Sequence, residues 1–222
     1  MLLPLFLKNL LFLLPSRKVV FTGFQGFSSS ASIPEVSVWW HLDSCPVPSG
    51  VSFSKVAPSI MAAVRANGIM GTIHIRAYGD FNSSGVDKEA LKSTNISLYS
   101  SIDYPSSYIE KIVTVEKYNT YKHFLMDLND WVSTNPPPLH LFLIFGNRDF
   151  SSSGILHRLR MCNYNILLAC PGRAHVAALC HAATIMWEWS SMLKGEDLIG
   201  KHFNYPPDGP TNSWYENLKC AS

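Results

Sequence analysis

The sequence predicts an α/β fold in which a mostly parallel sheet is covered by helices on both faces. From Glu35 onward, short β-rich runs alternate with longer helical stretches, which is typical of such domains. The runs LFLIF (141–145) and NILLA (165–169) are apolar without alternation, as expected of central strands that are buried on both faces. With 222 residues, 47% apolar and 15% charged, the chain can bury a sizeable core, which excludes disorder over its full length.

Strands are expected, in chain order, at residues 36–42, 72–78, 95–99, 140–145 and 164–169. Helices are expected at residues 53–67, 86–93, 118–133, 151–161 and 174–194. Asn67-Gly68 is a suitable helix stop, and the prolines at 136–138 favour an extended chain before the fourth strand. The stretch 102–116 has no clear period and is expected to be a loop or an insertion.

Three segments follow from this pattern: a leader at 1–34, a domain at 35–194 and an irregular tail at 195–222. The apolar runs of the leader are too short to span a bilayer, and its basic, serine-rich, acid-free remainder fits an organelle transit peptide. A functionless extension or an error in the gene structure remains the alternative.

Charge and cysteine content exclude several classes of protein. From Glu35 onward the chain has 15 Lys and Arg against 16 Asp and Glu, unlike a strongly basic nucleic-acid binder, so any contact with nucleic acid must be local. Five cysteines without a CxxC pair indicate neither a disulfide framework nor a zinc ribbon.

Acidic residues directly follow three of the expected strands. Asp43, Asp80 and Asp149 should meet at one edge of the sheet, because right-handed crossovers bring the carboxyl ends of parallel strands together. Converging carboxylates commonly hold Mg²⁺, which can activate water for phosphodiester hydrolysis. Alternatively, each acid has a local role: Asp43 in a turn, Asp80 in a loop or cap, and Asp149 as a helix N-cap. Spacing leaves both interpretations open.

Four segments carry a resemblance to a known family: VWWHLDSCPVPSG, TIHIRAYGD, LFLIFGNRDFSSSGILHRLRMCNYNILLACP and IMWEW. Together they resemble the limkain-type NYN domain of the PIN-like nuclease superfamily, and they are similar to plant proteins described as endonucleases. The resemblance covers roughly residues 35–194. It implies a three-layer sandwich with a mostly parallel central sheet and a metal-dependent RNA endonuclease site at one end.

Carried over residue by residue, the family's motifs imply catalytic roles for Asp43, Asp80, Asp127 and Asp149, with Asn147 as a supplementary oxygen donor. Among these, Asp43, Asp127 and Asp149 are the implied ligands of Mg²⁺ or Mn²⁺.

Three acidic positions of the family's motifs are not acidic in this chain: His41, Tyr121 and Asn147. Asparagine and neutral histidine can still coordinate a metal, but the negative charge that attracts Mg²⁺ is reduced. The resemblance therefore predicts a weakened or lost ribonuclease activity.

Arginines form the second candidate feature. Residues 150–187 contain no acid but include Arg158, Arg160 and Arg173, which together with Arg148 are candidate RNA-binding residues beside the acidic edge. Alternatively, Arg158 and Arg160 are solvated helix residues with buried stems.

The expected function is that of an RNA endonuclease-like protein that acts on single-stranded RNA in RNA metabolism or the regulation of gene expression. The alternative is a catalytically inactive module that binds RNA or a protein partner. Family resemblance implies a peroxisomal or cytoplasmic location, whereas a cleaved leader would imply a mitochondrion or plastid.

Overall fold

The computed structural model describes residues 33–82, 85–100, 116–146, 154–172, 179 and 181–204. Side chains of helix α4 (Glu116–Thr134) are described from Thr120 onward. Nearly all of the expected leader, residues 102–115 of the loop expected at 102–116, and the tail beyond residue 204 lie outside this part, whereas Glu116 begins α4. None of the described helices combines the length and the apolar character that a membrane span requires.

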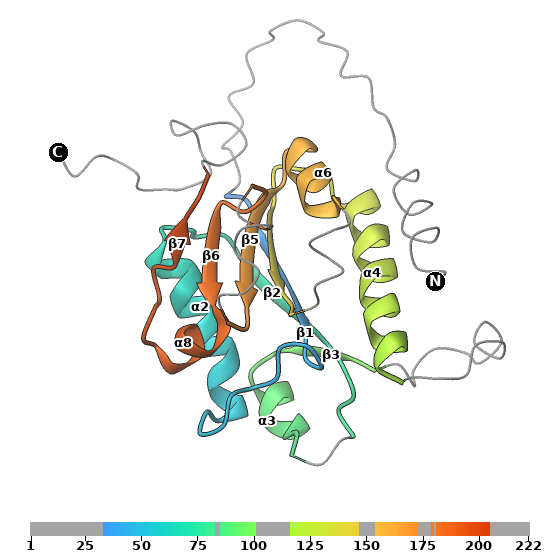
Figure 1. Ribbon diagram of the computed structural model, residues 1–222, viewed down its shortest axis with the longest axis vertical. Helices are drawn as coiled ribbons and strands as arrows, with labels where there is room; N and C mark the ends of the chain where they lie inside the picture. The colour runs from blue at the N-terminus through green and yellow to red at the C-terminus, as the bar shows by residue number, and fades with distance from the viewer. Residues whose placement is uncertain are drawn as a thin grey trace, which may run out of the picture.

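Seven strands in the described part form one sheet, in the order β3-β2-β1-β4-β5-β6-β7 (Figure 1). Neighbouring strands are parallel, except that β7 is antiparallel to β6. The strands are β1 (Val36–His41), β2 (Ile73–Tyr78), β3 (Ser97–Tyr99), β4 (His140–Ile144), β5 (Asn165–Cys170), β6 (Ile185–Glu188) and β7 (Lys201–His202). All five expected strands are present, which confirms the predicted α/β fold class.

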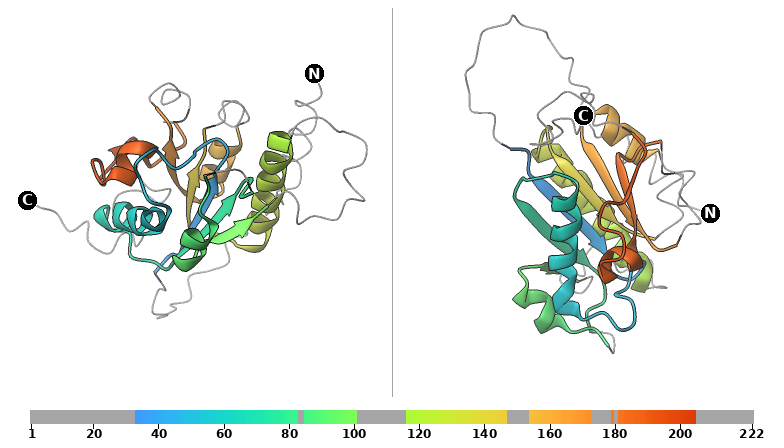
Figure 2. Two further views of the ribbon diagram at one scale, coloured as in Figure 1. Left: turned by 90° about the horizontal axis from the view of Figure 1, so that it is seen from below. Right: turned by 90° about the vertical axis from the view of Figure 1, so that its left-hand side faces the viewer.

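Helices cover both faces of this sheet, giving three layers (Figure 2). On one face, Val38 and Trp40 of β1 pack with residues of α2 (Val56–Ala66), α3 (Lys88–Ser93) and α8 (Trp189–Lys194). On the other face, Trp39 packs with residues of α4 and α6 (Ile155–Met161). Because both faces are covered, every residue of β1, β4 and β5 is buried. A short 3-10 helix, η1 (Phe53–Lys55), precedes α2.

The prediction of a single helix at 174–194 is wrong. Its second half contains strand β6, which pairs with β5, followed by helix α8. Ile185 and Trp187 pack on one face of the sheet and Met186 on the other, so tertiary burial on both faces overrides the helical pattern of the sequence. Glu188 ends the strand and caps α8, because its carboxylate accepts the backbone N–H groups of Ser190 and Ser191 at 3.1 and 2.6 Å.

The tail predicted from residue 195 is irregular only in part. Lys201 and His202 form β7, whose pairing with Met186 and Ile185 extends the sheet by one short antiparallel strand. The sequence of this region is rich in glycine, proline and asparagine, and a strand of only two residues is too short to give a β pattern that could be recognised there.

Candidate functional site

Asp43 and Asp80 lie next to each other at the carboxyl edge of the sheet. Asp43 follows β1 and Asp80 follows β2, and the backbone N–H of Asp80 donates to Asp43 Oδ1 at 3.1 Å. Gly79 permits this approach, because a Cβ at this position would lie 2.8 Å from Leu42 Cβ and 3.1 Å from Asp43 Oδ1. The two residues therefore meet at this edge through the Asp80 backbone, while the Asp80 carboxylate accepts the backbone N–H of Asn82 at 2.8 Å. The chemical role of both acids stays a prediction.

Helix α4 supplies a third group to this edge. The Thr120 hydroxyl donates to Asp43 Oδ2 at 2.7 Å, so each oxygen of the Asp43 carboxylate accepts one hydrogen bond from within the protein. Each carboxylate oxygen keeps further acceptor capacity. Sequence reasoning missed Thr120, because it lies 77 residues from Asp43 in the chain and nothing in its local pattern indicates the contact.

The turn after β1 is anchored to the end of β4. The Ser44 hydroxyl oxygen accepts the backbone N–H of Gly146 at 3.0 Å and lies 2.8 Å from His41 Nδ1. Gly146 leaves no room for a side chain, because a Cβ there would lie 2.4 Å from the Ser44 carbonyl oxygen and 2.9 Å from Pro171 Cγ. The ends of β1, β4 and β5 thus hold the turn that presents Asp43.

His41 occupies the position where the family resemblance implies an acid. Its side chain is buried, only 4% exposed, and its ring makes edge contacts with Tyr121 and Phe124 at centroid distances of 5.7 and 5.8 Å. Burial lowers the pKa of His41 to about 4, although the nearby Asp43 acts in the opposite direction. The imidazole is therefore neutral at neutral pH, and it supplies none of the negative charge that a carboxylate would bring to this position.

Among the described residues, His41 Nε2 is buried and has no hydrogen-bond partner. The other ring nitrogen, Nδ1, faces the Ser44 hydroxyl. The tautomer of the ring decides whether Nδ1 or Ser44 Oγ donates the hydrogen bond between them. A buried polar atom without a partner is unfavourable, so this nitrogen lowers the stability of the fold beside the acids.

Asp127 is separated from this pair of acids. The Tyr78 hydroxyl donates to Asp127 Oδ2 at 3.1 Å, and burial together with the adjacent Asp127 raises the pKa of Tyr78. Asp127 lies seven residues after Thr120, about 10 Å farther along the helix axis. The structure thus places Asp127 beside Tyr78 and behind the edge, rather than with Asp43.

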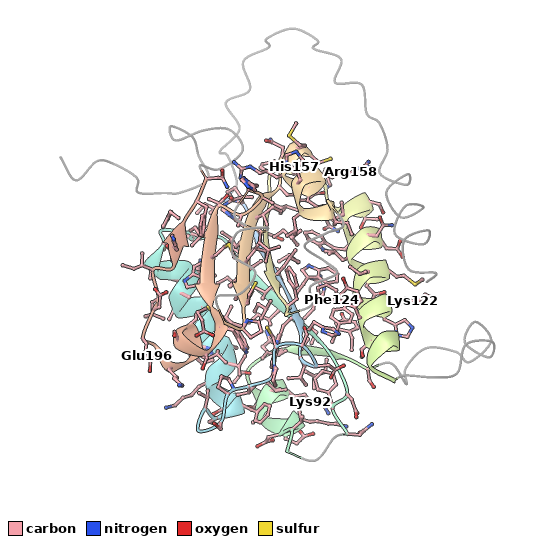
Figure 3. All side chains as sticks on the ribbon, in the orientation of Figure 1. Lys92, Lys122, Phe124, His157, Arg158 and Glu196 are labelled. Atoms are coloured by element: carbon pink, nitrogen blue, oxygen red, sulfur yellow. The ribbon has the colours of Figure 1, made fainter. Side chains whose placement is uncertain are left out.

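His123 lies one turn before Asp127 on α4. Burial lowers the pKa of His123, Asp127 opposes this effect, and Lys122 adds to it. Figure 3 shows Phe124 and Lys122 on this helix, which flanks the site.

The arginine patch is only partly within the described residues. Arg158 and Arg160 belong to α6, and Arg160 Nη1 donates to the Thr184 hydroxyl at 3.3 Å, where Thr184 immediately precedes β6. This is the amino edge of the sheet, opposite the acids; Figure 3 shows Arg158 at the α6 end of the molecule. The expected position of Arg158 and Arg160 beside the acidic edge is therefore corrected, because α6 runs back to the start of β5.

Four other predicted residues lie outside the described part: Asn147, Arg148, Asp149 and Arg173. Their roles stay predictions.

A divalent metal fits the described residues in ligand type but not in number. Asp43 and Asp80 offer the oxygen ligands that Mg²⁺ prefers. Within the described ranges, however, no three His, Cys, Asp or Glu side chains gather into a group that could hold a metal ion. The described residues alone therefore do not complete a metal site.

The fold and the acids at its carboxyl edge define an α/β domain of the PIN-like nuclease type. The family model of the NYN domain matches residues 35–188, more than half of the chain, and the chain belongs to this family. NYN domains are nuclease-like and related to RNA, and the nucleases among them typically use divalent metals. A comparison with curated proteins found none that matches this chain.

Proposed function

We propose that this chain acts in RNA metabolism or the regulation of gene expression as an RNA endonuclease-like protein whose Mg²⁺- or Mn²⁺-dependent site is weakened. Its motifs support assignment to the limkain-type branch of the NYN family. One observation carries the proposal: Asp43 and Asp80 are joined at the carboxyl edge, while the adjacent His41 is buried and uncharged at neutral pH.

Electrostatics explains why such a site would be weak. Each additional carboxylate near a divalent cation contributes a large attraction, about 4 kcal/mol per unit charge at 4 Å with an effective dielectric constant of 20. His41 supplies none of this attraction, and Asp127 is engaged with Tyr78 farther along α4. Two acids with water as the remaining ligands would hold Mg²⁺ loosely.

The geometry also explains why the site would not be lost altogether. Thr120 and the Asp80 backbone fix the orientation of the Asp43 carboxylate, and each oxygen keeps a free lone pair for a ligand. Preorganised ligands bind with a smaller loss of conformational freedom. Thr120 is thus a positioning residue in this proposal.

Cleavage of RNA by the full chain tests the proposal. A 5′-labelled single-stranded RNA is incubated with the protein in EDTA, in Mg²⁺ and in Mn²⁺. We expect slow cleavage that needs a high concentration of Mg²⁺ or Mn²⁺ and that disappears in Asp43→Asn. Lys194→Gln, which removes a charge from the exposed end of α8, serves as the control and should cleave like the wild type. Rapid cleavage at low metal concentration, or cleavage that survives both Asp43→Asn and Asp149→Asn, contradicts the proposal.

The second candidate is a catalytically inactive binding module. The buried, neutral His41, at a position where the family resemblance implies an acid, favours it. Such a module would bind single-stranded RNA or a protein partner equally well in EDTA and in Mg²⁺, and it would leave the RNA intact at every metal concentration.

A further inference from the structure

A lysine side chain is connected to the candidate site through two hydrogen bonds. One oxygen of the Asp80 carboxylate accepts the backbone N–H of Asn82 at 2.8 Å. The side-chain carbonyl oxygen of Asn82 in turn accepts a hydrogen bond from the ammonium group of Lys88. Because the backbone of Asp80 also donates to Asp43, these contacts place Lys88 beside the pair of acids at the carboxyl edge of the sheet.

The helix that Lys88 begins is fixed to the rest of the fold. Helix α3 lies at the end of the sheet where β1 and β2 finish (Figure 1). Leu91 anchors the helix in the core, and the Asp87 carboxylate caps it by accepting the backbone N–H of Ala90 at 2.9 Å. The side chain of Lys88 is half-buried, so its ammonium group has less conformational freedom to lose when a ligand binds.

The acids next to Lys88 in the sequence do not neutralise its charge. The Asp87 carboxylate caps α3, and Glu89 pairs with Lys92 at 3.3 Å. The ion pairs within the described part of the chain do not include Lys88. An ammonium group has three N–H donors, and Asn82 accepts one of them. In the described structure, Lys88 thus keeps two donors and its full charge for a ligand.

A cation at this position offsets a repulsion within the proposed site. The carboxylates of Asp43 and Asp80 repel the phosphates of an approaching RNA strand, and a loosely held metal ion neutralises them only in part. Lysine is a common phosphate ligand that acts as a point charge. The ammonium group of Lys88 is separated from Asp80 only by Asn82, so it attracts phosphate where the strand has to pass the acids.

We propose that Lys88 binds a backbone phosphate of the RNA and so positions the strand over Asp43 and Asp80. This inference rests on the proposed function, because it names a group that brings RNA to that same site. A contact to phosphate carries no sequence information. Lys88 therefore contributes affinity and register but no preference for a base.

The salt dependence of RNA binding by the full chain tests this inference. Fluorescence anisotropy in EDTA measures the affinity for a 5′-labelled single-stranded RNA at several salt concentrations. We expect Lys88→Gln to reduce the slope of log affinity against log salt by about 0.7, as for the loss of one phosphate contact on a single strand, and to bind about fivefold more weakly at 0.1 M salt. Lys88→Arg should keep the slope because it keeps the charge.

A matched control separates this contact from a general effect of charge. Lys92→Gln removes the same charge from the same helix, about one turn farther along. Lys92 is exposed and already paired with Glu89, so the slope should match that of the wild type. An equal reduction of the slope in Lys88→Gln and Lys92→Gln contradicts a specific role of Lys88.

Two further variants separate the charge of Lys88 from its structural contacts. Asn82→Ala removes the hydrogen bond to Lys88 but leaves the charge, so it should keep the slope of the wild type. Lys88→Met keeps the apolar part of the stem but loses the charge, so it should reduce the slope as Lys88→Gln does. A reduced slope in Asn82→Ala, or an unchanged slope in Lys88→Met, would mean that Lys88 acts only by holding the chain after β2, and it overturns the inference.

The outcomes separate this inference from the proposed function. Wild-type protein that binds no RNA overturns both. Wild-type protein that binds RNA, together with a Lys88→Gln variant of unchanged slope, overturns the role of Lys88 alone, because metal-dependent cleavage by the wild type does not depend on that result.

Discussion

The hydroxyl of Thr120 donates to Asp43 Oδ2 across 2.7 Å, and this contact joins helix α4 to the turn after β1. It fixes one acid of the candidate site from outside the sheet. The other oxygen of Asp43 is held by the backbone of Asp80. The position of Asp43 thus depends on two elements that are distant in the sequence.

Removal of the Thr120 hydroxyl should destabilise the protein. Thr120→Val keeps the shape of the side chain but leaves a half-buried carboxylate without this donor, so we expect a loss of about 1–3 kcal/mol in the free energy of unfolding. Urea denaturation measures the change. Thr134→Val on the same helix is the control, because the Thr134 side chain is exposed and its hydroxyl bonds only to neighbours in the sequence: the carbonyl oxygens of Asp130 and Trp131 and the side-chain amide of Asn135. Equal stability of Thr120→Val and the wild type would contradict the role of this bond.

Acid should destabilise the fold through His41. The pKa of His41 is lowered from 6.5 to about 4 by burial, so the folded protein keeps the ring neutral while the unfolded chain takes up a proton below pH 6.5. The stabilisation is therefore complete above pH 6.5 and is lost as the pH falls toward 4. Between about pH 7.5 and pH 5 the loss from this group is about 2 kcal/mol.

Urea denaturation at several pH values, in EDTA so that no cation contributes, measures this dependence. His41→Phe should show a shallower loss between pH 7.5 and pH 5 than the wild type. His123, whose pKa is also lowered, contributes with the same sign in both proteins. Equal slopes for His41→Phe and the wild type would show that folding does not lower the pKa of His41.

A side chain at Gly146 should disrupt the site. An added Cβ would lie 2.4 Å from the Ser44 carbonyl oxygen, which is backbone and cannot move cheaply. We expect Gly146→Ala to lower the free energy of unfolding by about 3 kcal/mol. Gly50→Ala is the comparison: Gly50 has a φ of +82° and nothing within 4 Å of the added Cβ, so only backbone strain of about 1 kcal/mol is expected. If Gly146→Ala loses no more stability than Gly50→Ala, the close packing around Gly146 is not the constraint.

The sheet was predictable because the runs 141–145 and 166–169 are apolar at each position, as expected of strands that are buried on both faces. The meeting of Asp43 with Asp80 was predictable for a related reason: parallel strands deliver the residues that follow them to one edge. Strand β6 was not predictable from its local pattern. The residues Ile185–Glu188 follow an alanine-rich stretch, and their extended conformation depends on pairing with β5.

The side-chain partners of the acids were beyond sequence reasoning. Asp127 has the right residue type for a metal ligand, yet the Tyr78 hydroxyl engages it two turns away from Thr120. Arg160 has the right type for a phosphate ligand, yet α6 carries it to the amino edge of the sheet, where it bonds Thr184. Residue type and topology predict which edge an acid reaches, but helix length and side-chain reach decide its partner.

The weakness of the metal site is tested most directly by isothermal titration calorimetry of Mn²⁺ binding to the full chain. The wild type is compared with a double variant that combines His41→Asp and Asn147→Asp. If missing negative charge weakens the site, the wild type binds Mn²⁺ loosely and the double variant binds at least about tenfold more tightly. Tight binding by the wild type that is lost in Asp43→Asn, or no gain in a correctly folded double variant, would contradict the account.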